Sequence, residues 1–298
     1  MNLLRERKIG FIGAGKAANV IATALYDCGY TISSISSRKL SSATSLSHHI
    51  PGCVPSFNIQ DTASECDMIF VTTPDDAIPL VAKSTLWTSQ CIVIHCSGSK
   101  TLEVLNPARD QGAQIGSLHP MQTFSGETGN KESLKGVTFA IDGEDDVPDI
   151  LRQLVSDLGG FPVKIAPELR PLYHLSAFLA CGGLVTLVSK ASSLWESMGY
   201  NDSTGLKSLL PLIKKTIENI ESKGTYESMT GPVNRGDIST ISEHISAIRK
   251  QSPDTMDIYK SISKYATKLS SQNGGIDYNT SQQIMDLIEN GSTITGES

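Results

Sequence analysis

Short runs of apolar, often β-branched residues alternate with amphipathic helical patterns along the first half of the chain. Period-two spacing is typical of strands, and i, i+3, i+4, i+7 spacing is typical of helices. The pattern predicts strands at residues 8–12, 31–35, 68–72, 91–95 and 114–117, with 137–141 and 162–165 extending the same sheet. The connecting helices are expected at 16–28, 41–50, 77–84 and 101–110. This alternation predicts an α/β fold with a doubly wound, mainly parallel sheet.

The strand pattern ends near residue 166, and helical patterns separated by turn residues follow. They predict helices at 169–198, 203–223, 237–250, 255–270 and 280–289. The Gly182-Gly183 pair inside the first of these would permit close packing or a bend. We therefore expect an α/β domain over residues 1–166 and an all-helical domain over residues 167–298.

Composition and net charge indicate which classes of binding partner to expect. The chain has 298 residues, of which 39% are hydrophobic and 19% charged, with a net charge of -6. This is a globular composition, and its negative charge gives no attraction to nucleic acid or an anionic membrane. We expect a small-molecule substrate and a second copy of the chain as partners.

The cysteines and the N-terminus predict a cytoplasmic protein. The six cysteines form neither a CxxC pair nor the spacing of a zinc site, so we expect reduced thiols and no metal. The start of the chain lacks the features of a signal peptide. The apolar run Ala177–Val188 is shorter than the roughly 20 residues that span a bilayer, which predicts a helix buried in protein.

A glycine-rich loop follows the first predicted strand. Gly13-Ala14-Gly15-Lys16-Ala17-Ala18 reads GxGxxA between a strand and a helix. Gly13 suits the tight turn and Gly15 allows backbone to approach a pyrophosphate. Lys16 and Ala17 begin the helix, whose free N–H groups would hold the anion. The loop predicts a nucleotide site.

The end of the second strand predicts which nucleotide binds. Many nucleotide-binding chains carry an acidic residue there, whereas this chain has Ser36, Ser37, Arg38 and Lys39. Hydroxyls and a guanidinium suit a 2'-phosphate, which favours NADP. A solvated surface loop is the alternative.

Thr72, Thr73 and Pro74 end the third strand, and we expect this loop to lie against the cofactor. For the charges of Asp75 and Asp76 we expect the ordinary role of acidic residues at a helix N-terminus.

Four residues are candidates for chemistry. Ser97 follows the fourth of these strands and would orient a substrate or cap the next helix. His119 would donate a hydrogen bond across the cleft or only fasten its loop. His174 opens the long apolar helix and would supply a proton to a carbonyl oxygen, or be a buried structural histidine. Arg235 would clamp a carboxylate or phosphate, or contact an Asp between helices.

The motifs GFIGAGKAA, TTPDDAI, HCSGS, SLHPMQTF, YHLSA and TGPVNRGD occur in this order. Together they resemble a family of oxidoreductases with an NADP-binding Rossmann domain, related to the coenzyme F420-dependent NADP oxidoreductases, and a helical C-terminal domain of unknown function. The helical domain resembles that of 6-phosphogluconate dehydrogenase-like enzymes, which implies a homodimer built on the helices. Gly182 stands where related sequences often have Asn, so one expected side-chain contact is missing.

Some relatives are assigned as an alternative ketopantoate reductase. The resemblance therefore implies NADPH-dependent reduction of a small 2-oxo acid, with 2-dehydropantoate first among the substrates. An imine-reducing or F420-linked oxidoreductase is the enzymatic alternative. A non-catalytic NADP-sensing protein is an alternative of another class.

Overall fold

The computed structural model describes residues 3–124 and 129–290, and the chain divides into two compact units. The first unit is Met1–Cys181 and the second is Gly182–Ser298. Each is described by itself.

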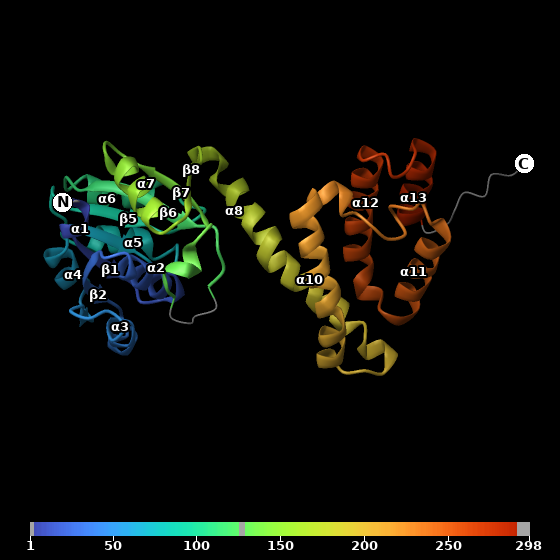
Figure 1. Cartoon of the computed structure of the whole chain (residues 1–298), viewed down its shortest axis with the longest axis horizontal. Coiled ribbons are helices and arrows are strands. Elements are labelled where there is room, and N and C mark those ends of the chain that lie inside the picture. Colours follow the sequence, from blue (N-terminus) through green and yellow to red (C-terminus); the bar gives the residue numbers. More distant parts are fainter. Residues whose placement is uncertain (1–2, 125–128, 291–298) are drawn as a thin grey trace, which may run out of the picture. The chain divides into compact units, whose positions relative to one another are not determined.

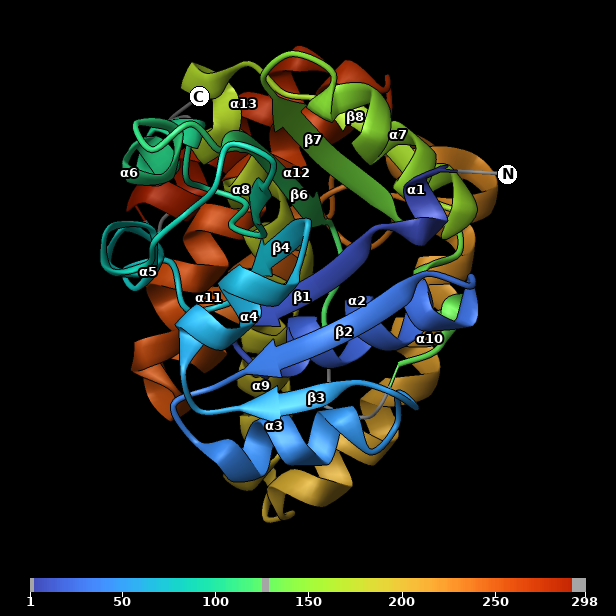
Figure 2. The same ribbon diagram turned by 90° about the vertical axis from the view of Figure 1, so that its left-hand side faces the viewer.

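The first unit is built on one eight-stranded sheet with strand order β3-β2-β1-β4-β5-β6-β7-β8, and Figure 2 shows strands β3, β2, β1 and β4 side by side. All neighbouring strands are parallel except β6 and β7, which are antiparallel. The doubly wound, mainly parallel sheet is therefore confirmed. The strands are β1 (Lys8–Ile12), β2 (Thr31–Ser36), β3 (Val54–Ser56), β4 (Met68–Val71), β5 (Ile92–His95), β6 (Gln114–Pro120), β7 (Thr138–Gly143) and β8 (Phe161–Lys164).

Helices cover both faces of this sheet (Figure 1). They are α1 (Leu3–Glu6), α2 (Lys16–Asp27), α3 (Leu40–Ser47), α4 (Ile59–Glu65), α5 (Ile78–Ser84), α6 (Asn106–Arg109) and α7 (Val147–Asp157), with short 3-10 helices at Leu102–Leu105, Lys131–Leu134 and Pro167–Leu169. Side chains of α2, α3 and α7 share one core with Phe11 and Phe70. Side chains of α4 and α5 share the other with Ile69 and Val71. Successive residues of a strand thus face opposite cores, as the pleat requires.

The sheet ends at Lys164, near the expected domain boundary at 166, but the compact units divide between Cys181 and Gly182. The difference arises because α8 (Arg170–Phe178) packs on the sheet unit. Arg170 is buried there, and the Tyr173 hydroxyl contacts His119 of β6.

The expected long helix begins with α8, continues through a π-helical turn at Leu179–Gly183, and ends with α9 (Leu184–Ser193) and a 3-10 turn at Glu196–Met198. The Gly182-Gly183 pair lies in the π-helical turn, a form that commonly interrupts α-helices. Pro167–Met198 is the one stretch within residues 3–124 and 129–290 that is long and apolar enough to cross a membrane, with mean hydropathy 1.6. One such helix is weak evidence for a membrane span, because core helices of soluble proteins satisfy the same criterion.

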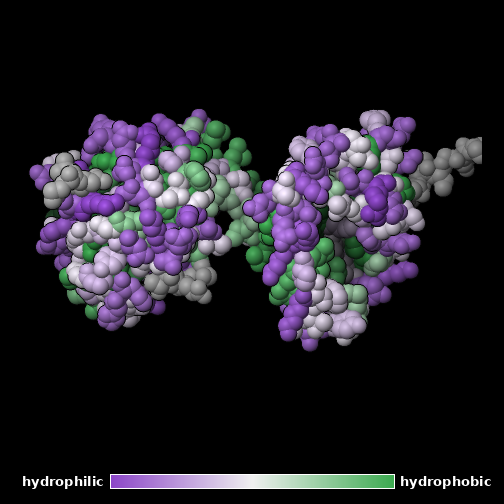
Figure 3. All heavy atoms as spheres, in the orientation of Figure 1, coloured by the Kyte–Doolittle hydropathy of each residue, from purple (hydrophilic) through white to green (hydrophobic). Residues whose placement is uncertain are grey.

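The prediction that this apolar helix is buried is wrong for the single chain. The most apolar part of Pro167–Met198 contains no buried residue. Arg170 is the buried residue of α8, whereas Leu172, Leu175 and Phe178 face solvent. Figure 3 shows apolar residues gathered along this stretch.

The second unit is entirely helical over its described residues. Beyond α9 it contains α10 (Asp202–Glu227), α11 (Ile238–Gln251), a 3-10 turn (Pro253–Thr255), α12 (Met256–Gln272) and α13 (Tyr278–Asn290). Ile241, Ala266, Ile284 and Leu287 form its core between α11, α12 and α13. The expected helical domain is confirmed, with each helix close to its predicted range.

Candidate functional site

The glycine loop joins the carboxyl ends of three neighbouring strands. Gly13 has φ of +110°, and a Cβ there would lie 2.8 Å from the carbonyl carbon of Thr72. The Gly13 N–H donates to the Ser36 carbonyl oxygen at 2.8 Å, and the Gly13 carbonyl oxygen accepts the Thr72 hydroxyl at 2.8 Å. Only glycine combines this φ with so close an approach. The loop is therefore fixed between β2 and β4, where the strand order changes direction.

The N-terminus of α2 opens directly from this loop. Gly15 is its N-cap and forms no side-chain cap, and no acidic residue lies in the first turn. A Cβ on Gly15 would meet no atom of residues 3–124 or 129–290 within 4 Å, so these residues leave the space beside it open. Lys16 is exposed, and Ala17 packs against the core. Free N–H groups and the helix dipole can therefore hold an anion here.

Hydroxyls and cations surround the end of β2. Ser36 is fully buried, and its hydroxyl has no partner among the described residues. The Ser37 N–H donates to the Ser56 carbonyl at 3.0 Å, which ties this turn to β3. Arg38 is exposed and forms no ion pair within the described ranges. Its guanidinium is thus available to a ligand.

The loop after β4 carries a second buried hydroxyl that lacks a partner in the described part of the chain, that of Thr73. The Pro74 carbonyl accepts a hydrogen bond from the Ala77 N–H at 2.9 Å, which closes the turn before α5. Orphan hydroxyls at Ser36 and Thr73 therefore flank the glycine loop, and buried hydroxyls normally have partners.

Ser97 links the loop after β5 to the loop after β4. Its hydroxyl donates to Asp75 Oδ2 at 2.7 Å and accepts from the Lys100 N–H at 3.1 Å. Ser99 also donates to Asp75, at 3.1 Å. The single proton of the Ser97 hydroxyl is thus already used. The capping alternative for Ser97 is wrong, because the next helix begins at Leu102 with Thr101 as its N-cap and no side-chain cap; Ser97 closes the turn before it.

The role expected of Asp75 is corrected by these contacts. Helix α5 begins at Ile78, and its N-cap is Ala77, so Asp75 does not cap it. Its carboxylate instead accepts two hydroxyls from the loop after β5.

His95 ends β5 and lies fully buried behind this loop. Its Nδ1 accepts the Ser97 N–H at 3.2 Å, so the neutral ring carries its proton on Nε2. Burial, reinforced by the nearby Arg170 cation, lowers the pKa of His95 to about 3. The residue is therefore a neutral support of the loop near pH 7.

His119 and His174 meet at Gly98. A Cβ built on Gly98 would lie 2.8 Å from Nε2 of His119 and 2.9 Å from Nδ1 of His174. The two ring centroids are 6.1 Å apart. One histidine comes from β6 and the other from α8, so the fold brings together two residues that the sequence only suggested separately.

Tyr173 orients His119. Its hydroxyl lies 2.9 Å from Nδ1 of His119, and the rings are nearly perpendicular. Burial lowers the pKa of His119 to about 4, with smaller contributions from His174 and Arg170. When the Tyr173 hydroxyl donates to Nδ1, the neutral His119 ring carries its own proton on Nε2, the nitrogen that lies against Gly98. His174, in contrast, is exposed on α8.

Arg235 belongs to the second unit. Its guanidinium lies 3.8 Å from the Asp237 carboxylate, and its side chain is largely exposed. Asp237 caps α11 by accepting the Thr240 N–H at 3.1 Å. The Arg-Asp contact anticipated as an alternative is therefore present, within one loop rather than between helices.

Sequence reasoning missed Asp75, Gly98, Tyr173 and Arg170 as members of this cluster. Gly98 and Tyr173 stand inside quoted motifs next to assigned residues, so proximity could have found them. Nothing in the local pattern predicts a buried arginine at 170. No group of three or more His, Cys, Asp or Glu side chains suited to a metal occurs in residues 3–124 or 129–290.

Family models match most of the chain. Residues 3–120 match the Rossmann-like domain, and residues 137–266 match a domain of unknown function, DUF2520. No curated protein sequence matches the chain significantly.

Solved structures share the fold. A Bacteroides fragilis protein with a provisional NADP oxidoreductase assignment superposes with TM-score 0.74 at 22% identity, over 88% of this chain and 98% of that one. Pyrroline-5-carboxylate reductase from Streptococcus pyogenes gives 0.61 at 16% identity, over 91% and 99%. A reductive aminase from Aspergillus terreus, solved with NADPH and ethyl levulinate, gives 0.62 at 16%, over 94% and 98%. At these identities the likeness concerns the fold.

Proposed function

We propose that this chain, which combines a Rossmann-like domain with a DUF2520 domain, is an NADP-dependent oxidoreductase that reduces a small 2-oxo acid. The first substrate to test is 2-dehydropantoate, whose product would be pantoate. One observation carries the proposal. Two histidines converge on Gly98 at the carboxyl edge of the sheet, the edge that also bears the glycine loop.

The glycine loop region suits NADP. Gly13 permits the tight turn, and Gly15 lies at a helix N-terminus without a side-chain cap. Ser36 and Thr73 offer hydroxyls that have no partner among residues 3–124 and 129–290. Arg38 and Ser37 would hold the 2'-phosphate. The bound cofactor would supply the hydride. The similar fold of the reductive aminase solved with NADPH supports this choice.

The two histidines would then have different roles, one as proton donor and one as hydrogen-bond donor. His174 is exposed, so it can give a proton to the substrate oxygen and regain one from water. His119 stays neutral near pH 7 and offers its Nε2 proton as a fixed hydrogen bond, because burial lowers its pKa to about 4. Ser97 holds the Gly98 loop through Asp75 instead of binding substrate. The role of Arg235 as a carboxylate ligand stays a prediction.

The test is a panel of 2-oxo acids and cyclic imines with NADPH oxidation followed at 340 nm and products identified by mass spectrometry. We expect pantoate from 2-dehydropantoate. His174→Ala should lower kcat by about 100- to 10,000-fold with cofactor affinity retained. His244→Ala, a histidine in α11, is the matched control. Tight NADPH binding with no turnover of any compound would instead favour an NADP-sensing protein.

Arg38 decides cofactor preference in this scheme. Arg38→Ala should weaken NADPH binding about 10- to 100-fold, because a charge-assisted hydrogen bond to phosphate contributes roughly 1.5–3 kcal/mol. NADH binding should be almost unchanged. Isothermal titration with both cofactors measures this, with Arg152→Ala, exposed on α7, as control. Equal losses for both cofactors would return Arg38 to the role of a solvated surface residue.

Imine reduction is the second candidate, and the fold likeness to pyrroline-5-carboxylate reductase and a reductive aminase favours it. The same two histidines would then face a C=N group. The substrate panel separates the two, since one product is a hydroxy acid and the other an amine.

A further inference from the structure

Arg170 is the one Asp, Glu, Lys or Arg side chain that is buried in the described part of the chain, at 1% exposure. It begins α8, and it forms no ion pair with any described carboxylate. Its guanidinium donates to the carbonyl oxygens of Ser97, at 3.4 Å, and Lys100, at 2.8 Å, and to the Ser117 hydroxyl. Its three acceptors among the described residues are thus neutral, and the Asp142 carboxylate acts on Arg170 through its charge without a direct ion pair.

Burying this cation is costly. Removing a guanidinium from water carries a large desolvation penalty, and burial lowers the pKa of Arg170, an effect that the charge of Asp142 on β7 partly opposes. The Nε atom has no acceptor among the described residues. A buried methionine would fill similar space without this penalty, so the hydrogen bonds of Arg170 must accomplish something that packing does not.

The hydrogen bonds of Arg170 connect the segments of the candidate site. The Ser97 and Lys100 carbonyls bracket Gly98, against which both histidines lie. Tyr173 and His174 are three and four residues after Arg170, so they project from the same face of α8. Ser117 lies on β6, two residues before His119. Arg170 therefore belongs to one of the three segments that carry the Gly98 contact and bonds to the other two.

We propose that Arg170 is a positioning residue, which fixes the Gly98 loop, β6 and the start of α8 relative to one another so that His119 and His174 converge. Its effect on catalysis rests on the proposed function, whereas its effect on geometry does not.

The charge of Arg170 has a second effect. His119 is faced by Tyr173 and His174 from α8, by Arg170, and by Asp75 from the loop after β4. The arginine cation opposes protonation of His119, while Asp75 favours it. Loss of the cation should therefore raise the pKa of His119 without restoring its ordinary value, because burial is the larger cause.

Two variants test the proposal. Arg170→Met removes charge and hydrogen bonds, and Arg170→Lys keeps charge but loses the planar fork. NMR would record contacts between the Gly98 Hα protons and both imidazole rings, and the pKa of His119. We expect both variants to weaken the contacts, and only Arg170→Met to raise the pKa. In turnover with NADPH, kcat should fall on the order of 100-fold in Arg170→Met and roughly 10-fold in Arg170→Lys, with cofactor affinity retained.

Arg5→Met, an arginine before the amino end of β1, is the control and should change none of these readouts. Should Arg170→Met fail to fold, Arg170→Lys and Ser117→Ala decide, and unchanged Gly98 contacts in both would overturn the proposal. Altered contacts in a chain that reduces no 2-oxo acid or imine would support the positioning role and reject the proposed function. Unchanged Gly98 contacts in variants that keep normal activity would reject the positioning role and support the proposed function.

Discussion

No side chain fits at Gly98. Any side chain there would enter both imidazole rings, since its Cβ alone would be within 2.9 Å of each. Backbone thus forms the wall opposite the histidines. Selectivity for a substrate must then be set by other positions.

His95 makes the stability of the sheet unit depend on pH. The unfolded chain binds a proton at His95 below about pH 6.5, whereas the folded chain does not until about pH 3, because burial lowers the pKa. Between these values the unfolded state holds more protons, so stability falls as pH falls. The slope is about 1.4 kcal/mol per pH unit for one such group.

We therefore expect His95→Gln to lose less stability than the parent chain between pH 6.5 and 4. Urea unfolding at several pH values, followed by Trp87 fluorescence in a Trp195→Phe background, measures the sheet unit alone. His119, whose pKa is also lowered, contributes equally to both proteins. Parallel pH slopes for the two proteins would contradict this prediction.

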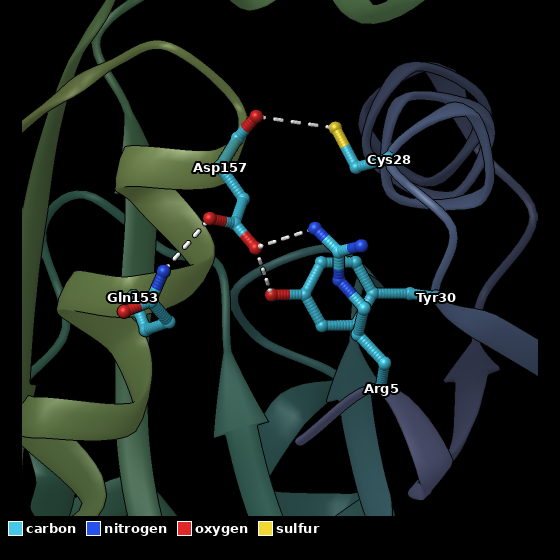
Figure 4. Close-up of polar contacts among 5 residues, drawn as sticks. All are labelled: Arg5, Cys28, Tyr30, Gln153 and Asp157. Carbon is cyan, nitrogen blue, oxygen red and sulfur yellow. Dashed lines mark hydrogen bonds and ion pairs between the residues drawn. The ribbon is translucent and has the colours of Figure 1, made fainter. Parts of the chain in front are cut away.

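At the scale of elements, Asp157 connects the end of α7 to the amino ends of β1 and β2 (Figure 4). Its carboxylate accepts Tyr30 Oη at 2.8 Å and Gln153 at 2.7 Å, and Arg5 lies 3.5 Å away. Its carbonyl accepts the Cys28 thiol at 3.2 Å. Burial and the bond to Asp157 raise the pKa of Tyr30, so the hydroxyl remains a donor.

Asp157→Ala should destabilise the sheet unit by about 2 kcal/mol, because the buried Tyr30 hydroxyl would lose its charged acceptor. The matched control is Asp149→Ala on the same helix, where the carboxylate is exposed and pairs with Arg152. Its effect should stay within about 0.5 kcal/mol. The same Trp87 urea assay compares them, and equal midpoints would show that the Asp157 contacts contribute little.

The elements predicted correctly have strong periodicity, and those missed do not. Strand β3 has three residues and contains Pro55, which suggests a turn. It forms because an edge strand pairs on one side only, here with β2, so a missing N–H is tolerated. Likewise Asp75 precedes a helix as a capping residue would, and its real partners, Ser97 and Ser99, lie in another loop. Long-range contacts of this kind leave no local pattern.

At the scale of the molecule, α9 presents a solvent-exposed apolar face. Leu184, Val185 and Leu187 are 40%, 65% and 42% exposed, and Leu210 and Leu212 of α10 are exposed as well. Large apolar patches are uncommon on soluble monomers and typically mark interfaces. A homodimer through the helical unit, which the sequence resemblance implies, would cover this face, and we propose it as the solution state.

Sedimentation analysis should then give twice the mass of the chain. Leu187→Glu should shift the protein toward the monomer, since a buried carboxylate at an apolar interface is strongly disfavoured. Leu80→Glu, at an exposed leucine of α5, introduces the same charge elsewhere and should leave the dimer intact. A monomer at micromolar concentration in the parent chain would contradict the proposal.

The reactivity of the cysteine thiols gives a second way to test whether this helix is covered. Burial raises the pKa of Cys53, Cys66, Cys91 and Cys96 to about 12, which leaves almost no reactive thiolate at neutral pH. Cys181 is the exposed cysteine, and it lies in the π-helical turn between α8 and α9. Its rate of alkylation by a maleimide therefore reports, in the unaltered protein, whether this helix faces water or a neighbour.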